Sequence, residues 1–330
     1  MDISYSSKIH IAPYDGFIGN TQTYISGRVL RNRKVIYKPS DGKIRNILNS
    51  WINFKTNELS NIEVVLELGG SYYESITDDE GYFFFNIDNE SYQSPEDTDA
   101  QWTSYAVHIV TENHKQLKSK QNIHATGRLY EPHESAAFGI ITDIDDTLLK
   151  TDINTVLRWR MFYNSVLLNP FQRKIVPDSN HFYRQVVNVK NPIFYISNSP
   201  NNLQPYVRVL LDHNNFPTGP VFLRDIGRQM LRPRLLTDGA KYLHSKKLIE
   251  AFPKLSFLMF GDAAESDIDI YVELYKEFKD RIRMIAIRSL GDKNKDQSIL
   301  KMKDTFPNLP LHLFTDFSKI ELDPDILAPI

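Results

Sequence analysis

The sequence contains no cysteine, no long hydrophobic run and no excess of charge of either sign. The absence of cysteine excludes disulfides, thiolate metal sites and cysteine nucleophiles, and it is compatible with the cytosol. No stretch approaches the length that crosses a bilayer, and residues 1–6 lack the basic and apolar regions of a signal peptide. A net charge of −2, from 39 basic and 41 acidic residues, creates no global field that would recruit nucleic acid. We expect a soluble, cytoplasmic protein that does not bind nucleic acid.

The first part of the chain is rich in strand-forming residues. At 330 residues the chain is long for a single domain, so we expect two. Short β-branched and aromatic runs at 23–30, 62–68, 82–87 and 104–110 are bounded by Gly, Asp, Asn and Pro. They predict a smaller all-β, sandwich-like domain over residues 1–133, in which we find no catalytic grouping. A basic stretch at 31–61 interrupts the pattern, and its apolar stripe at helical spacing favours a packing face or an insertion: Ile44, Ile47, Leu48 and Trp51.

A tight turn at residues 77–82 precedes a run of three phenylalanines. Gly81 is available there for a positive φ angle. The segment Thr-Asp-Asp-Glu-Gly-Tyr-Phe resembles a hairpin of transthyretin-like and carboxypeptidase-regulatory-like sandwiches. Its acidic residues could bind Ca²⁺, but an ordinary solvated hairpin is the favoured interpretation.

From residue 134 onward the pattern alternates between strands and helices. Apolar strand candidates at 138–141, 193–196, 256–260 and 284–287 alternate with helical stretches at 202–214, 240–251 and 267–279. This alternation predicts a doubly wound parallel sheet over residues 134–330, with helices on both faces. The segment 292–297 is expected to be a polar loop.

Polar side chains that could take part in catalysis or metal binding follow the first three of these strand candidates. Asp143, Asp145 and Asp146 crowd directly after the first, and such carboxylates destabilise a fold unless a cation such as Mg²⁺ neutralises them. An acidic turn is the alternative, but ligands of open α/β sheets bind at the carboxyl ends of strands. Ser197 follows the second strand and could hold a phosphate oxygen. Asp262 and Asp267 follow the third; they could complete a metal shell, although Asp267 could merely cap a helix.

Three lysines on the 240–251 helix could reach the same edge of the sheet, namely Lys241, Lys246 and Lys247. A lysine there would neutralise carboxylates and bind phosphate as a point charge. Most lysines on such a helix are solvated, and chemistry alone does not separate the three.

The order Asp-x-Asp-x-Thr, Ser, Lys and Gly-Asp-x-x-x-x-Asp resembles that of the haloacid dehalogenase superfamily of phosphohydrolases. Four segments narrow the resemblance to the actin-patch-associated phosphatidate phosphatase family, including its bacterial members. They are Ile-Thr-Asp-Ile-Asp-Asp-Thr (141–147), Tyr-Ile-Ser-Asn-Ser-Pro (195–200), Gly-Pro-Val-Phe-Leu-Arg-Asp (219–225) and Gly-Asp-Ala-Ala-Glu-Ser-Asp-Ile-Asp-Ile-Tyr (261–271). The chain departs from the family at Ala240, where a His usually precedes the lysine, and at Ala263-Ala264, where Ser-Gly is usual.

The resemblance implies a fold like that of the haloacid dehalogenases and a role for each matching residue. Asp143 would be the nucleophile that becomes an aspartyl-phosphate, and Asp145 the general acid and then base. The other implied catalytic residues are Thr147, Ser197 and Lys241. Phosphate and substrate would be bound by Ser197, Asn198 and Arg224. Mg²⁺ would be held by Asp143, the Asp145 carbonyl, Asp262 and Asp267.

Two basic regions could serve substrate recognition. Residues 150–174 interleave aromatic and basic side chains, a combination that suits an anionic lipid surface and would give weak peripheral membrane contact. The basic members are Lys150, Arg158, Arg160, Arg173 and Lys174, and a second cluster comprises Arg224, Arg228, Arg232 and Arg234. Pairing with carboxylates of the near-neutral chain is an equally good interpretation.

The sequence therefore predicts a Mg²⁺-dependent phosphatidate phosphatase. The alternatives are a phosphatase of a soluble phosphomonoester or phosphoprotein, and a catalytically silent lipid- or protein-binding module. The intact set of four motifs argues against the last of these.

Overall fold

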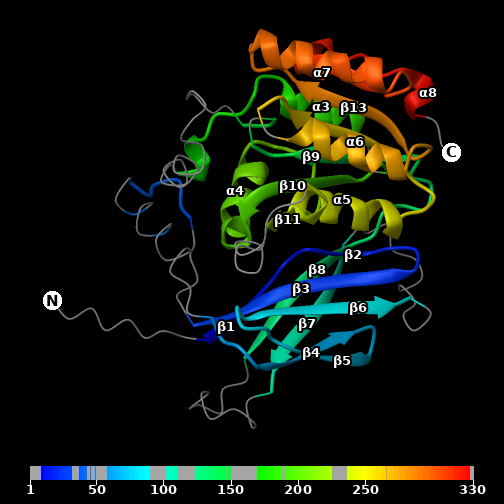
Figure 1. Ribbon diagram of the computed structural model, residues 1–330. Coiled ribbons are helices and arrows are strands. Elements are labelled where there is room, and N and C mark those ends of the chain that lie inside the picture. The colour runs from blue at the N-terminus through cyan, green and yellow to red at the C-terminus, as the bar shows by residue number, and fades with distance from the viewer. Residues whose placement is uncertain are drawn as a thin grey trace. The chain divides into compact units, whose positions relative to one another are not determined.

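The computed structural model describes residues 9–31, 37–42, 45, 49, 58–89, 102–110, 123–145, 147–149, 169–187, 190–224, 236–264 and 266–327. Contacts divide the chain into two compact units, Met1–Glu131 and Pro132–Ile330. Each unit has its own sheet (Figure 1). In the part of the chain that is described, no helix is both long enough and apolar enough to span a bilayer.

The first unit is built on a separate, mainly antiparallel sheet. Its strands are β1 (Ile9–Pro13), β2 (Gly16–Ile18), β3 (Gln22–Arg31), β4 (Glu63–Leu68), β5 (Ser71–Ile76), β6 (Tyr82–Asp88), β7 (Trp102–Ile109) and β8 (His124–Tyr130). They pair in the order β1-β3-β2-β8-β7-β4-β5, with β6 beside β3. Buried side chains from seven of these strands meet in one apolar core, and the partly buried Tyr73 of β5 packs against it. The predicted strand-rich first part of the chain thus forms a mainly antiparallel sheet that is separate from the parallel sheet of the second unit.

The turn before β6 has the predicted backbone. Gly81 has a φ of +78°, and a Cβ on it would lie 2.7 Å from the Val29 carbonyl oxygen. Asp78 Oδ1 accepts hydrogen bonds from the backbone N–H groups of Glu80 and Tyr82, at 3.0 and 2.9 Å. This carboxylate therefore serves the turn itself. The apolar stripe from Ile44 to Trp51 lies outside the described residues.

The second unit contains a six-stranded parallel sheet. Its strands are β9 (Phe138–Asp143), β10 (Ile193–Pro200), β11 (Val221–Arg224), β12 (Ser256–Asp262), β13 (Ile282–Arg288) and β14 (Leu311–Phe314). The strand order is β11-β10-β9-β12-β13-β14. The chain thus starts in the middle, proceeds to one edge, and then returns to build the other half. Such a reversal between neighbouring strands, here β9 and β12, creates a crevice at their carboxyl ends.

Helices cover both faces of this sheet. Successive side chains of β9 point to opposite faces, and two neighbouring residues contact helices on the two sides. The Thr142 hydroxyl lies 2.8 Å from the Tyr183 hydroxyl of α3 (Ser179–Val186). Asp143, the next residue, faces the opposite side and contacts Lys241 of α5 (Ala240–Ala251). Helix α6 (Asp267–Glu277) lies beside α5 on that same side (Figure 1). The remaining helices are α4 (Gln204–His213), α7 (Lys293–Thr305) and α8 (Pro324–Leu327).

The prediction of a polar loop at 292–297 is wrong. Asp292 caps α7 by accepting hydrogen bonds from the backbone N–H groups of Asn294 and Lys295, and the helix continues to Thr305. Ile299 is its one buried residue, so the helix is polar because it is exposed rather than irregular. The predicted strands of the parallel sheet are also longer than expected, since β9, β10 and β12 include the polar residues at their ends.

Candidate active site

The site is built at the carboxyl end of β9. Asp143 is the last residue of that strand and is fully buried. The next residues turn back sharply, because the backbone N–H of Leu148 bonds to the Ile144 carbonyl at 3.0 Å. This turn brings the Thr147 hydroxyl to Asp143 Oδ2, to which it donates a hydrogen bond of 3.2 Å. Thr147 therefore holds the carboxylate in one orientation. Asp146 lies outside the described residues.

Lys241 joins two of the predicted carboxylates. It is the second residue of α5 and is only 1% exposed. Its Nζ lies 2.6 Å from Asp143 Oδ1 and 2.6 Å from Asp267 Oδ1. A buried ammonium with two carboxylate partners avoids much of the desolvation cost that an isolated ion would carry.

Asp267 can approach the site because residue 261 is a glycine, which has no side chain to block it. A Cβ on Gly261 would lie 2.6 Å from Asp267 Oδ2 and 2.7 Å from Asp267 Cβ. In the actual chain, Asp267 Oδ2 instead accepts a hydrogen bond of 3.1 Å from the Asp262 backbone N–H. The N-cap of α6 is Ser266, so Asp267 occupies the first turn, where the helix dipole favours a negative charge. The carboxylate thus faces the site rather than capping the helix.

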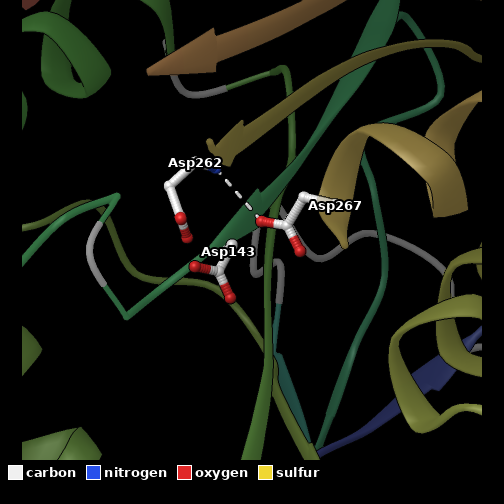
Figure 2. A group of neighbouring side chains, drawn as sticks. All are labelled: Asp143, Asp262 and Asp267. Atoms are coloured by element: carbon white, nitrogen blue, oxygen red, sulfur yellow. Dashed lines mark hydrogen bonds between the residues drawn. The ribbon is translucent and has the colours of Figure 1, made fainter. Parts of the chain in front are cut away.

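Three carboxylates converge on one point, as Figure 2 shows. Asp143, Asp262 and Asp267 are fully buried, and one oxygen from each lies within 4.8 Å of the others. Together with Lys241 they carry a formal charge of −2, from three carboxylates and one ammonium. A divalent cation would balance that charge, and clustered carboxylate oxygens are the ligands that hard cations prefer. The three aspartates could therefore bind a metal ion.

Ser197 contacts Asp145 rather than the three converging aspartates. Asp145 is half-buried, and its Oδ2 accepts hydrogen bonds from the Ser197 and Ser199 hydroxyls at 2.7 and 2.8 Å. The Ser199 backbone N–H in turn donates to Ser197 Oγ at 2.8 Å. Sequence reasoning did not select Ser199 as a site residue. Ser199 could have been predicted from its position two residues after Ser197, because residues i and i+2 of a strand point to the same face of the sheet.

The structure separates the three lysines. Lys246 is partly exposed and pairs with Glu277, a contact that raises its pKa, and it lies 3.8 Å from Glu250. Burial lowers the pKa of Lys247 to about 8. Lys241, in contrast, contacts Asp143 directly.

The two other predicted substrate-binding residues lie near the same edge. Asn198 is half-buried between the two serines. Arg224 ends β11, is buried, and pairs in register with Pro200. The remaining basic candidates lie outside the described residues, except Arg173 and Lys174, which follow the short helix η1 (Pro170–Gln172). Those outside are Lys150, Arg158, Arg160, Arg228, Arg232 and Arg234.

The region that carries all of these residues is similar to known phosphatases. Residues 138–289, slightly less than half of the chain, match the family described as "Phosphatidate phosphatase APP1, catalytic domain". "Phosphatidate phosphatase APP1" of Saccharomyces cerevisiae is 29% identical over 164 residues, which are 48% of this chain and 27% of that protein. "Uncharacterized protein C29B5.04c" of Schizosaccharomyces pombe is 26% identical over 155 residues, 46% of this chain and 25% of that protein. The chain thus spans about a quarter of each relative.

Similarity to solved structures is weak. A class C acid phosphatase from Bacillus anthracis aligns with a TM-score of 0.33 and 16% identity, over 55% of this chain and 67% of that one.

The family match contains every predicted site residue from Asp143 to Asp267. It supports the expectation that the chain is a phosphoric monoester hydrolase.

Proposed function

We propose that this protein is a Mg²⁺-dependent phosphatidate phosphatase that releases diacylglycerol and phosphate through an aspartyl-phosphate. The observation that carries the proposal is the buried contact of Asp143 with Lys241, beside Asp262 and Asp267, in a region similar to a phosphatidate phosphatase catalytic domain. In this proposal residues 134–330 form a phosphatase domain with a fold like that of the haloacid dehalogenases. The protein is then a bacterial-type member of the actin-patch-associated phosphatidate phosphatase family. Residues 1–133 form a separate domain without catalytic groups.

Asp143 is the proposed nucleophile. One of its carboxylate oxygens attacks phosphorus, the bond from phosphorus to the leaving oxygen breaks, and Asp145 gives that oxygen a proton. In the second half of the reaction Asp145 takes a proton from water, whose oxygen attacks phosphorus, releases phosphate and regenerates Asp143. Lys241 and Thr147 keep the Asp143 carboxylate oriented between these steps. Ser197 binds the phosphoryl group.

Mg²⁺ would be held by Asp143, Asp262, Asp267 and the Asp145 carbonyl. When bound, the ion would neutralise charge that develops on the transferring phosphoryl oxygens. The buried oxygens of the three aspartates and their excess negative charge fit this group. Chelation with excess EDTA should therefore abolish turnover, and added Mg²⁺ should restore it. Activity that survived chelation would remove the metal from the mechanism.

The experiment that tests the proposal compares phosphate release from phosphatidate in mixed micelles with release from a panel of soluble phosphomonoesters. We expect phosphatidate to be hydrolysed with the highest kcat/KM. Hydrolysis of the soluble esters alone would favour the alternative, a phosphatase of a soluble phosphomonoester or phosphoprotein. Hydrolysis of neither, by a folded protein supplied with Mg²⁺, would leave a non-catalytic binding module.

Docking on an anionic lipid surface is the proposed role of the basic residues between 150 and 174. Each basic side chain near such a surface contributes on the order of 1 kcal/mol, and salt screens it within a Debye length. Neutralising Arg158, Arg160, Arg173 and Lys174 together should impair hydrolysis of phosphatidate in vesicles and leave soluble esters unchanged. Added salt should act in the same way. Equal losses on both substrates would indicate a structural role instead.

A further inference from the structure

Ser199 lies beside Asp145, the proposed general acid and base, and contacts its carboxylate. It is 5% exposed and ends the run of residues from β10 that faces the site. Its hydroxyl donates to Asp145 Oδ2 at 2.8 Å, and its backbone N–H donates to Ser197 Oγ at 2.8 Å. Ser197 donates to the same Asp145 oxygen at 2.7 Å. The two serines therefore form a closed triangle of hydrogen bonds with one carboxylate oxygen.

The number of hydroxyl protons available shows that Ser197 and Ser199 cannot have the same role. A serine hydroxyl has a single O–H donor. In this structure the Ser197 proton is used on Asp145. If Ser197 binds a phosphoryl oxygen, that proton must leave Asp145, since one O–H cannot be fully donated to both. The bond from Ser199 is then the one that still fixes the Asp145 side chain.

We propose that Ser199 is a positioning residue that holds Asp145 in place when Ser197 turns its hydroxyl to the substrate, an inference that rests on the proposed function. The Ser199 backbone N–H keeps Ser197 Oγ beside Asp145, so the exchange requires only a rotation of the hydroxyl proton. Oδ2 already accepts two hydroxyl protons in this arrangement, which directs the transferable proton to Oδ1. That proton passes to the leaving oxygen as its bond to phosphorus breaks, and a proton from water restores it.

The leaving group of the substrate provides a readout that a purely structural role would not move. Nitrophenolate departs as a stable anion and needs little help from a general acid, whereas an alkoxide such as that of a glycerol phosphate needs a proton. Ser199→Ala should therefore lower kcat/KM, which reports the steps up to departure of the leaving group, by about tenfold to a hundredfold on an alkyl phosphomonoester and by much less on p-nitrophenyl phosphate. Ser199→Thr, which keeps the hydroxyl, should restore most of the alkyl activity.

The control is Ser256→Ala. Ser256 is also fully buried and donates a side-chain hydrogen bond, of 3.3 Å to the Ala137 carbonyl, but it begins β12 at the opposite end of the sheet. We expect this variant to change stability without any dependence on the leaving group. Ser197→Ala should lower activity on both substrates, because it removes a phosphoryl contact.

A double-mutant cycle completes the test. If Ser199 acts only through Asp145, adding Ser199→Ala to Asp145→Asn should cause no further loss on the alkyl ester. Additive losses of kcat/KM, or equal losses of kcat/KM for Ser199→Ala on the two esters, would overturn the positioning role while leaving the proposed function intact. A wild-type protein that hydrolyses neither these esters nor phosphatidate in mixed micelles with Mg²⁺ would overturn both.

Discussion

Buried polar groups are used differently in the two units of this protein. In the first unit, Thr77 is 1% exposed and connects two backbone positions, since its hydroxyl donates to the Leu59 carbonyl and accepts from the Ile62 N–H. Arg28 likewise donates from Nε to the Glu80 carbonyl at 2.8 Å. In the second unit, the buried charged side chains of one group instead contact one another at the carboxyl end of β9. Lys241 joins Asp143 to Asp267 there.

The difference is informative because the two arrangements have different energetic consequences. A buried hydroxyl that satisfies buried backbone groups prevents an unsatisfied donor or acceptor, which would cost about 1–3 kcal/mol. A buried cluster of like charges brings no such benefit, and replacing buried ions by apolar side chains is often neutral or stabilising. The cluster around Asp143 is therefore better explained by chemistry than by stability, whereas Thr77 and Arg28 are explained by stability alone.

Asp143→Asn should produce the largest effect on turnover. The change removes the attacking oxygen, so we expect kcat to fall by about a thousandfold or more. It also removes one of three crowded negative charges, so the folded state should be retained. Phosphate release and the thermal midpoint Tm, measured on the same preparation, check both expectations. Near wild-type turnover with Mg²⁺ would exclude Asp143 as the nucleophile.

Lys241→Met should give the next largest effect and should also lower stability. The buried carboxylates of Asp143 and Asp267 would lose their ammonium partner, and breaking a buried ion pair typically costs about 3–5 kcal/mol. Mg²⁺ should recover part of that loss by supplying positive charge. Lys246→Met and Lys247→Met are the matched controls on the same helix, and we expect both to be mild. Equal, small effects of all three on kcat and Tm would show that no lysine of α5 has the predicted role.

Gly261→Ala tests the packing behind the cluster. A methyl group there would lie 2.6 Å from Asp267 Oδ2, so the carboxylate or the strand must shift. We expect a loss of about 1–3 kcal/mol in the free energy of unfolding and a reduced affinity for Mg²⁺. Gly42→Ala is the control, because a Cβ at Gly42 would meet no atom of the described residues within 4 Å. A fully active Gly261→Ala protein with unchanged Mg²⁺ dependence would show that Asp267 need not sit where it does.

The four central strands of the parallel sheet, β9, β10, β12 and β13, could be predicted from the sequence because they are buried on both faces. Phe138–Ile141 and the corresponding runs of β10, β12 and β13 are continuous apolar segments, and helical spacing between them is clear. The strands β1, β2, β5 and β8 of the first unit were not predicted, nor were the edge strands β11 and β14 of the parallel sheet. In β5 the exposed residues include Tyr72 and Ile76, so the burial of side chains that usually marks a strand is weak. The capped but exposed helix α7 was missed for a related reason: its sequence is almost entirely polar.

The site could be predicted only as a set of residue types at strand ends. That Asp143, Asp262 and Asp267 would converge followed from the topology of a parallel sheet. The family resemblance favoured Lys241, but the chemistry of Lys241, Lys246 and Lys247 is the same, so the contact with Asp143 could be identified only from the position of α5. The contact of Ser199 with Asp145 depends on the turn after Asp143, whose course no local pattern specifies.

Thr77→Val should have the smallest effect on turnover while lowering stability, and it tests the contrast between the two units from the other side. Valine has nearly the shape of threonine but leaves the Ile62 N–H and the Leu59 carbonyl without the hydroxyl that now bonds to both. We expect the first unit to lose about 1–3 kcal/mol in its free energy of unfolding. At a temperature where both units remain folded, kcat on a soluble phosphomonoester should match the wild type, because every proposed catalytic group belongs to the second unit. Denaturant unfolding followed by circular dichroism, beside phosphate release, measures the two quantities. A large fall in kcat without unfolding would place part of the chemistry in residues 1–133.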